Sequence, residues 1–170
     1  MTDKKSENIK IVIQEKDFSI ENEYYFLSSN LPAAGAVVTF VGRVRDFSER
    51  PEVTGLILEH YPLMTEKSLS GIVGQARERW DIQRLSLIHR VGELSVEDQI
   101  VYVGVSSAHR DDAFEACRFV MDYLKTEAPF WKKERTSSGE AWVEAREKDQ
   151  RARERWETLP DPASDHDRGM

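Results

Sequence analysis

Strand-like and helix-like segments alternate along almost the whole chain, and this alternation constrains the fold more than any other feature of the sequence. Short runs rich in β-branched residues, as at 36–44, predict strands, and apolar residues at helical spacing predict helices. The predicted strands are 9–13, 36–44, 53–61, 82–91, 99–106, 131–136 and 141–145, and the predicted helices are 18–29, 65–80, 111–126 and 147–156. Asp17 and Thr65 suit the N-caps of the first two helices.

The resulting order, β-α-β-β-α-β-β-α-β-β-α, predicts an α+β fold in which helices pack on a mostly antiparallel sheet. Its first part matches the split βαβ, ferredoxin-like pattern. A chain of 170 residues is expected to form one domain, which we place at 9–156. The polar residues 1–8 and the acidic tail 157–170 are expected to be disordered.

The charge balance and the single cysteine exclude several classes of protein. The formal net charge of -7 argues against general nucleic-acid binding, which needs a basic surface. Cys117 is the one cysteine, so no intramolecular disulfide can form. The N-terminal residues contain no apolar run typical of a signal peptide, and no stretch approaches the ~18 apolar residues of a membrane span. We therefore expect a cytoplasmic protein that does not enter a membrane.

Metal and thiol chemistry are also not expected. The four histidines, His60, His89, His109 and His166, are scattered, and no Cys/His set has metal-ligand spacing. Cys117 lies on the apolar side of a predicted helix, which is typical of a buried, inert thiol. The chain's own thiol is therefore not expected to take part in a reaction.

Two clusters of cationic residues stand at the ends of predicted strands. Arg43 and Arg45 are two apart, so on a strand they would share one face; two solvated arginines explain this pattern equally well. His109 and Arg110 lie where a strand meets a helix N-terminus, a position that favours an anion. The alternative for the second cluster is a purely structural role, as a helix cap with a histidine that takes no part in binding.

A third cluster combines the end of one helix with the strand that follows it. Lys125 lies one helical turn after Met121, beside the apolar side of the helix, and Lys132 and Lys133 follow the break at Pro129. A lysine held close to apolar residues and other cations is suited to act as a base or a nucleophile. The alternative is that Lys125 extends into water from the end of the helix.

Taken together, the chain resembles the large, catalytic subunit of molybdopterin synthase. The matching segments are FVGRVR at 40–45, LEHYP at 58–62 with MTE at 64–66, IHRVGEL at 88–94, VGVSSAHR at 103–110, FEA at 114–116, MDYLKT at 121–126, APFWKKE at 128–134 and WVEA at 142–145. The resemblance covers about 9–156. Leu63 stands where the family is expected to have glycine after Pro62, and the tail after Trp156 matches nothing in the family.

The resemblance implies an α/β hammerhead with a small added β subdomain, and a homodimer that needs no cofactor. It implies a small ubiquitin-like partner whose C-terminal Gly-Gly carries a thiocarboxylate. Sulfur would pass from this tail to cyclic pyranopterin monophosphate, which gives the dithiolene of molybdopterin. By this resemblance Lys125 and Lys132 are the catalytic residues. The residues expected to bind the substrate are Arg43, Val44, Arg45, His109, Arg110, Lys125, Lys132, Lys133 and Glu134.

The residues themselves agree with this chemistry, since two anions must approach each other and several cations would offset their repulsion. Two other functions remain open at this stage. One is a small phosphate-ester hydrolase in which Arg45 and His109 bind phosphate, although no general base stands beside the arginines. The other is a non-catalytic module whose basic site binds an acidic or C-terminal peptide.

Overall fold

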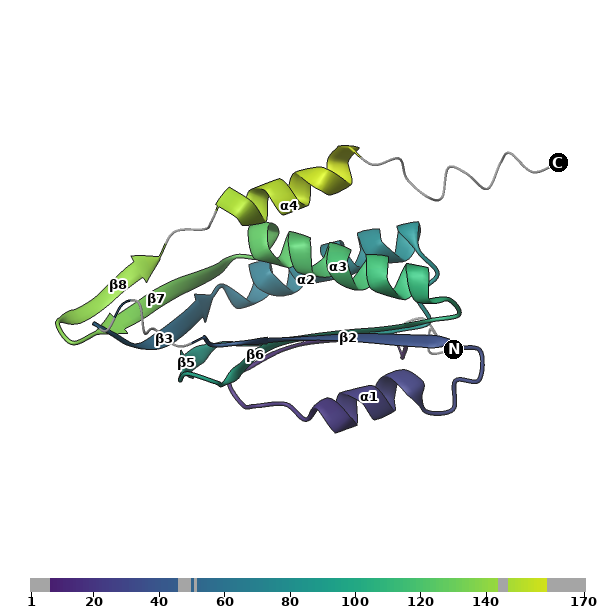
Figure 1. The fold of residues 1–170 in the computed structure, drawn as a ribbon, viewed down its shortest axis with the longest axis horizontal. Helices are drawn as coiled ribbons and strands as arrows, with labels where there is room; N and C mark the ends of the chain where they lie inside the picture. Colours follow the sequence, from purple (N-terminus) through teal and green to yellow (C-terminus); the bar gives the residue numbers. More distant parts are fainter. Residues whose placement is uncertain (1–6, 46–49, 51, 144–146, 159–170) are drawn as a thin grey trace.

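The computed structural model describes residues 7–45, 50, 52–143 and 147–158, and these form two four-stranded sheets with four helices. The main sheet contains β1 (Ile9–Gln14), β4 (Arg84–Arg90), β6 (Gln99–Ser107) and β2 (Ala36–Arg43), in that order (Figure 1). The second sheet contains β5 (Gly92–Leu94), β3 (Val53–His60), β7 (Phe130–Thr136) and β8 (Gly139–Val143). Among the strands of the described residues, only β1 and β4 pair in parallel and all other pairs are antiparallel, so the predicted α+β class is confirmed.

The ferredoxin-like pairing expected for the first part of the chain is not formed. Two strands, β4 and β6, separate β1 from β2, whereas a split βαβ unit has one strand there. β3 leaves the main sheet because its apolar side chains have a core of their own: Leu56 and Leu58 pack with Val44 and Leu94. The segment 92–98, which lies between two predicted strands, contributes the short strand β5 to the same second sheet.

Alternation along β4 and β6 divides the main core into two layers. Leu85, Leu87, Val103 and Val105 face α2 (Pro62–Arg79) and α3 (Arg110–Glu127), whereas Tyr102 faces the other layer. That opposite face is covered by α1 (Ile20–Ser28), which lies below the sheet in Figure 1. The side chains in both layers are almost completely buried, so the two faces of the sheet both contribute to the hydrophobic stabilisation of the fold.

Helix α1 approaches the sheet closely because of one glycine and is held there by one buried carboxylate. A Cβ on Gly104 would lie 2.3 Å from Cδ1 of Leu27, so only glycine leaves room for this leucine. Glu23 is 4% exposed, and its carboxylate accepts a hydrogen bond from Ser86 Oγ at 2.6 Å and pairs with Lys10 Nζ at 2.5 Å. These partners satisfy a charge that would otherwise be costly to bury.

Both predicted N-caps are wrong. Ser19 caps α1, since its hydroxyl accepts from the Asn22 amide. Asp17 instead accepts hydrogen bonds from the side chain of Gln99 and the amide of Phe18, and the bond from Gln99 is the main cause that lowers its pKa. The second helix starts at Pro62, a residue favoured in the first turn, and Thr65 lies inside it and donates to the Tyr61 carbonyl.

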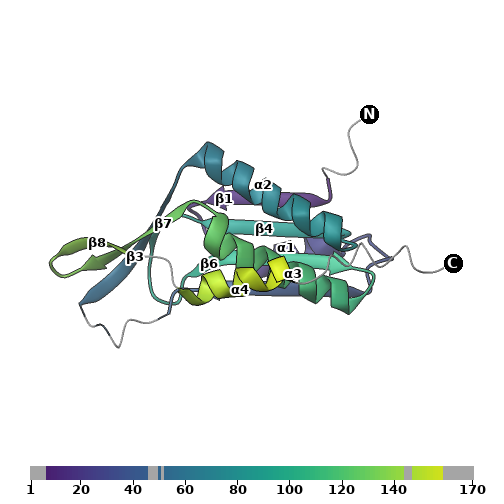
Figure 2. The same ribbon diagram turned by 90° about the horizontal axis from the view of Figure 1, so that it is seen from above.

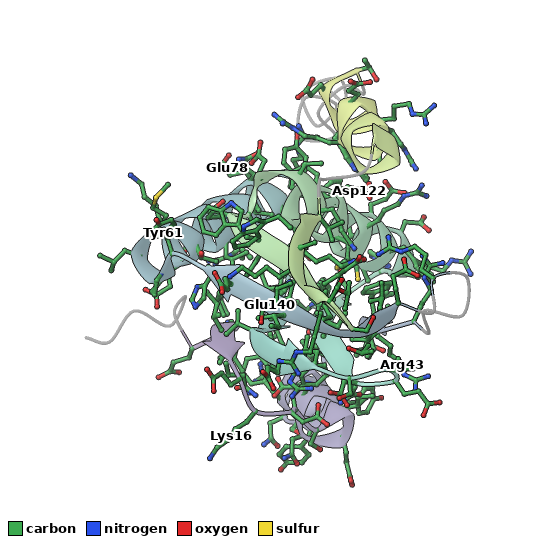
Figure 3. The ribbon with its side chains drawn as sticks, turned by 90° about the vertical axis from the view of Figure 1, so that its left-hand side faces the viewer. Lys16, Arg43, Tyr61, Glu78, Asp122 and Glu140 are labelled. Carbon is green, nitrogen blue, oxygen red and sulfur yellow. The ribbon has the colours of Figure 1, made fainter. Side chains whose placement is uncertain are left out.

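Trp156 packs helix α4 (Glu147–Thr158) on α3, and Arg153 and Arg155 add ion pairs with Glu127 and Glu115. Trp156 is 2% exposed, lies in edge contact with Trp80 and Phe119, and donates a 2.7 Å hydrogen bond to Asp122. Figure 2 looks onto this face, and Figure 3 shows Asp122 directly below α4. The helix runs to Thr158, two residues into the segment expected to be disordered. The rest of that tail, residues 1–6 and the end of the last predicted strand lie outside the described residues. No helix in the described part of the chain is long and apolar enough to cross a membrane.

Candidate active site

The main sheet has two ends, and the predicted site residues are divided between them. β6 begins at Gln99, which pairs with Arg43, and ends at Ser107, which pairs with Ala36. Because α3 follows β6 and packs back along it, the last turn of α3 lies near the start of β6 (Figure 1). We call these the Gln99 end and the Ser107 end of the main sheet. The second sheet projects from the Gln99 end (Figure 2).

Lys125 lies in the last turn of α3, at the Gln99 end. Its side chain is exposed, while the neighbouring Leu124 and Met121 are buried. A cation at this position interacts favourably with the C-terminal end of the helix dipole. The charge of Lys125 reaches His89 in β4, where it is one of the causes that lower the pKa of the imidazole. The charge of Lys125 thus affects the end of β4, and its side chain is accessible.

Lys132 and Lys133 lie in β7 and point to opposite faces of the second sheet. Lys132 is paired with Leu58 of β3 and so shares the face that carries the buried leucines. Lys133 faces the other side, where Nζ lies 2.9 Å from Oε1 of Glu59 and 4.3 Å from the ring centroid of Trp142. The two neighbouring lysines therefore cannot act on one substrate from the same face of the sheet.

Arg43, Val44 and Arg45 lie where β2 leaves its regular pairing. The strand has an irregularity between Gly42 and Arg43 and ends at Arg43, so the shared face of Arg43 and Arg45 stays a prediction. Both arginines are exposed, and Arg43 Nε donates to the carbonyl of Glu97. Val44 between them is buried in the core of the second sheet, and its amide donates to the carbonyl of Asp98.

Glu134 lies on the same face of β7 as Lys132 but is buried. It is 8% exposed and forms an ion pair with Arg50, a residue of the connection between β2 and β3. This pairing joins the strand that carries Lys132 to the segment that follows Arg45. The carboxylate is thus already engaged inside the protein.

His109 and Arg110 stand at the Ser107 end, far from the lysines. His109 is the N-cap residue of α3 without a side-chain capping bond, and Arg110 is exposed beside Asp111. Arg110 and Lys125 occupy the two ends of α3, which at ~1.5 Å per residue are separated by about 22 Å along the helix axis. Within one chain, the Gln99 end therefore carries Arg43, Arg45, Lys125 and Lys132. His109 and Arg110 lie at the Ser107 end.

Comparison with known proteins assigns this arrangement to a family. The sequence matches the MoaE protein family over residues 13–127. A molybdopterin synthase catalytic subunit from Haemophilus influenzae is 57% identical over 149 residues, which is 88% of this chain and 99% of the relative.

This chain belongs to the MoaE family.

Solved structures agree with this assignment. The molybdopterin biosynthesis MoaE protein from Burkholderia ambifaria has a TM-score of 0.76 and 49% sequence identity, covering 89% of this chain and 99% of that one. A chain in the complex of subunits 1 and 2 of molybdopterin-converting factor from Helicobacter pylori has the same fold, with a TM-score of 0.66 at 20% identity over 81% of this chain and 91% of its own. The expected family is confirmed, and with it the expectation of an enzyme of molybdenum cofactor biosynthesis.

Three aromatic rings of this MoaE-family chain that sequence reasoning did not assign to the site lie beside it. His89 of β4 stacks on Phe130 of β7 with ring centroids 3.8 Å apart, and His60 of β3 lies 6.1 Å from the same ring. The family-like segments contain all three residues, but they are distant in sequence and no spacing rule connects them. Among the described residues, no three His, Cys, Asp or Glu side chains are grouped so as to hold a metal ion.

Proposed function

We propose that this chain transfers sulfur from the thiocarboxylated C-terminus of a small ubiquitin-like subunit to cyclic pyranopterin monophosphate, which forms the dithiolene of molybdopterin. The observation that carries the proposal is the group of cations at the Gln99 end, to which the last turn of α3, β7 and the end of β2 contribute in a MoaE-family fold. Both reactants are anions, and an array of cations offsets the repulsion between them.

The sulfur has to be delivered by a partner because the chain's own thiol is unsuited to carry it. Cys117 is 4% exposed on α3, and burial raises the pKa of its thiol to about 12. The thiolate is the reactive form of cysteine, so this group is inert near neutral pH. The Helicobacter pylori complex of two converting-factor subunits supports a protein partner for this fold. We place the reaction in the cytoplasm, where such a donor would remain reduced.

Within the site, Lys125 and Lys132 are proposed as the catalytic residues. Lys125 has an accessible amine on a rigid helix end, and Lys132 lies on the strand that starts directly after it. An amine can exchange a proton during sulfur addition, which a guanidinium cannot do near neutral pH. Arg43 and Arg45 are proposed to bind the phosphate, since arginine suits bidentate recognition of that group.

His109 and Arg110 are proposed to act on the substrate bound by a second copy of the chain. Within one chain they lie at the wrong end of α3, so a homodimer is needed to bring them to the lysines. β2 is an edge strand of the main sheet. It runs from Ala36 at the Ser107 end to Arg43 at the Gln99 end. An antiparallel contact between two β2 edges would set the Ser107 end of one chain beside the Gln99 end of the other.

Val44, Glu134 and Lys133 are given supporting roles in this proposal. Val44 is part of the core beneath the end of β2, and Glu134 holds Arg50 against β7. Lys133 pairs with Glu59 on the far face of the second sheet. These three side chains already have partners within the chain. We therefore propose that they hold the strands in place and do not contact the pterin directly.

Incubation of the chain with the pterin precursor and the thiocarboxylated small subunit tests the proposal through formation of the dithiolene product. Product that depends on both the chain and the thiocarboxylate supports it. Release of phosphate from the precursor without the partner would instead support a phosphate-ester hydrolase. Tight binding of the small subunit with no change in the pterin would support a non-catalytic binding module.

A further inference from the structure

A group of rings lies at the junction of the two sheets, directly beside the candidate catalytic lysines. His89 comes from the end of β4, and Phe130 is the first residue of β7. Their ring planes are 13° apart with centroids at 3.8 Å, which is a stacked contact. His60, the last residue of β3, is paired with Phe130 across the second sheet, with its ring 6.1 Å away. Phe130, which belongs to the second sheet, therefore also contacts the main sheet through His89.

His89 is a neutral and fixed ring. It is 8% exposed, and burial is the main cause that lowers its pKa to about 4. Its Nδ1 lies 2.8 Å from the carbonyl oxygen of Arg90, so Nδ1 carries the proton and donates. In the main sheet His89 has Ile13 of β1 on one side and Val101 of β6 on the other. A ring held in this way offers Phe130 a rigid, uncharged surface.

The location of Phe130 determines how the two lysines stand relative to each other. The chain leaves α3 at Ala128, and the amide of Phe130 donates to the Ala128 carbonyl at 2.8 Å, which makes the connection tight. Lys125 lies on the helix before this connection. Lys132 lies on the same face of β7 as Phe130, two residues later. A shift of Phe130 would move Lys132 relative to Lys125.

We propose that His89 is a positioning residue: by stacking on Phe130 it fixes the connection between α3 and β7 and so sets the separation of Lys125 and Lys132. The inference rests on the proposed function only where it concerns turnover, because the contact that orders the connection exists whatever the lysines do. A ring that merely filled the core would stabilise the protein without any specific effect on this connection.

The test compares His89→Leu, which removes the ring, with His89→Phe, which keeps a ring but not the hydrogen bond to Arg90. Hydrogen exchange is measured for the amides of 126–133, with the amides of β6 as the internal reference. We expect exchange at 126–133 to be at least about tenfold faster in His89→Leu, equivalent to ~1.4 kcal/mol. In His89→Phe it should stay within about threefold of the wild type. Phe130→Tyr and Phe130→Leu form a second pair that alters the other ring, in case His89→Leu does not fold.

Turnover provides the second measurement. Loss of lysine alignment should lower kcat by about 10²-fold in His89→Leu, since misplacement by ~1 Å has effects of that order. The KM for the pterin and the affinity for the small subunit should be unchanged, and His89→Phe should restore kcat. Unchanged exchange in the ring-less variants, or normal kcat despite faster exchange, would overturn the inference. If the wild-type chain transfers no sulfur, the proposed function fails, while the exchange data still decide whether His89 holds the connection.

Discussion

Lys132 and Lys133 are adjacent in β7 and lie on opposite faces of the second sheet. Lys132 is paired with the buried Leu58, whereas Lys133 contacts Glu59 at 2.9 Å and the ring of Trp142. Substituting each lysine in turn therefore removes the same charge at neighbouring positions, but from opposite faces of the second sheet.

Lys132→Ala is expected to lower kcat/KM for sulfur transfer by about ten- to a hundredfold. A charge-assisted contact contributes roughly 1.5–3 kcal/mol, and ~1.4 kcal/mol corresponds to a factor of ten. Lys133→Ala is the matched control and is expected to stay within about threefold of the wild type, because its partners lie on the far face. Steady-state rates under identical partner concentrations measure both. Equal losses in the two variants would contradict the assignment of Lys132 to the site.

The contrast between these lysines also shows what the sequence could and could not predict. Alternation already requires neighbours in a strand to face opposite sides, yet the resemblance assigned both lysines to one substrate. The boundaries of most elements were predicted within a few residues, because their apolar periodicity is strong. The division of His109 from Lys125 was also implicit, since a helix from 111 to 126 has to separate its ends. The stack of His89 on Phe130 could not be predicted, because it depends on how two sheets meet.

Stability should fall as the pH drops below 6.5, owing to His89. The folded protein keeps this imidazole neutral, with a pKa of about 4 against 6.5 for the exposed group, so the unfolded chain binds the proton first. The contribution of neutral His89 to the free energy of unfolding is fully present above pH 6.5 and is lost as the pH falls towards 4. Its full size is about 3 kcal/mol at 1.36 kcal/mol per pKa unit.

Urea unfolding of the wild type and His89→Phe at several pH values between 7 and 4 measures this effect. The difference in unfolding free energy between the two proteins should shift in favour of His89→Phe as the pH falls. Carboxylates that also titrate in this range cancel in the comparison, because both proteins share them. A difference that is independent of pH would show that the imidazole is not kept neutral in the fold.

Gly104→Ala should destabilise the protein by roughly 1–3 kcal/mol, as expected for overpacking a filled core. The added Cβ would lie 2.3 Å from Cδ1 of Leu27 and 2.8 Å from Cε1 of Tyr102. Gly74→Ala is the control: it lies in α2 with nothing within 4 Å, so alanine should stabilise the helix by about 0.5–1 kcal/mol. Denaturation midpoints at unchanged m-value measure both. If Gly104→Ala left the free energy of unfolding unchanged, α1 would be able to move away from the sheet without loss of stability.

Cys117→Ala should retain sulfur transfer when the thiocarboxylated partner is supplied. The thiol is 4% exposed, its Sγ lies 3.7 Å from the Val103 carbonyl, and burial raises its pKa to about 12. The native protein should for the same reason react with thiol reagents only after unfolding. The variant is expected to lose about 1–2 kcal/mol of stability to a small cavity. A folded Cys117→Ala variant without activity would indicate that this thiol carries the sulfur.

Lys125→Arg separates a catalytic amine from a surface charge. The side chain is exposed in the last turn of α3, so arginine fits there and keeps the favourable interaction with the helix dipole. The variant should fold and bind the small subunit like the wild type. A guanidinium stays protonated and can neither accept a proton nor attack an acyl group, and general acid–base catalysis typically contributes ~10²–10⁴-fold. Turnover at saturating partner and precursor should therefore fall by at least ~10²-fold. Lys133→Arg, which alters the far face of β7, should keep near-normal turnover under the same conditions. If Lys125→Arg also turns over normally, Lys125 is a solvated cation at a helix end, and the proton transfer has to be assigned to Lys132.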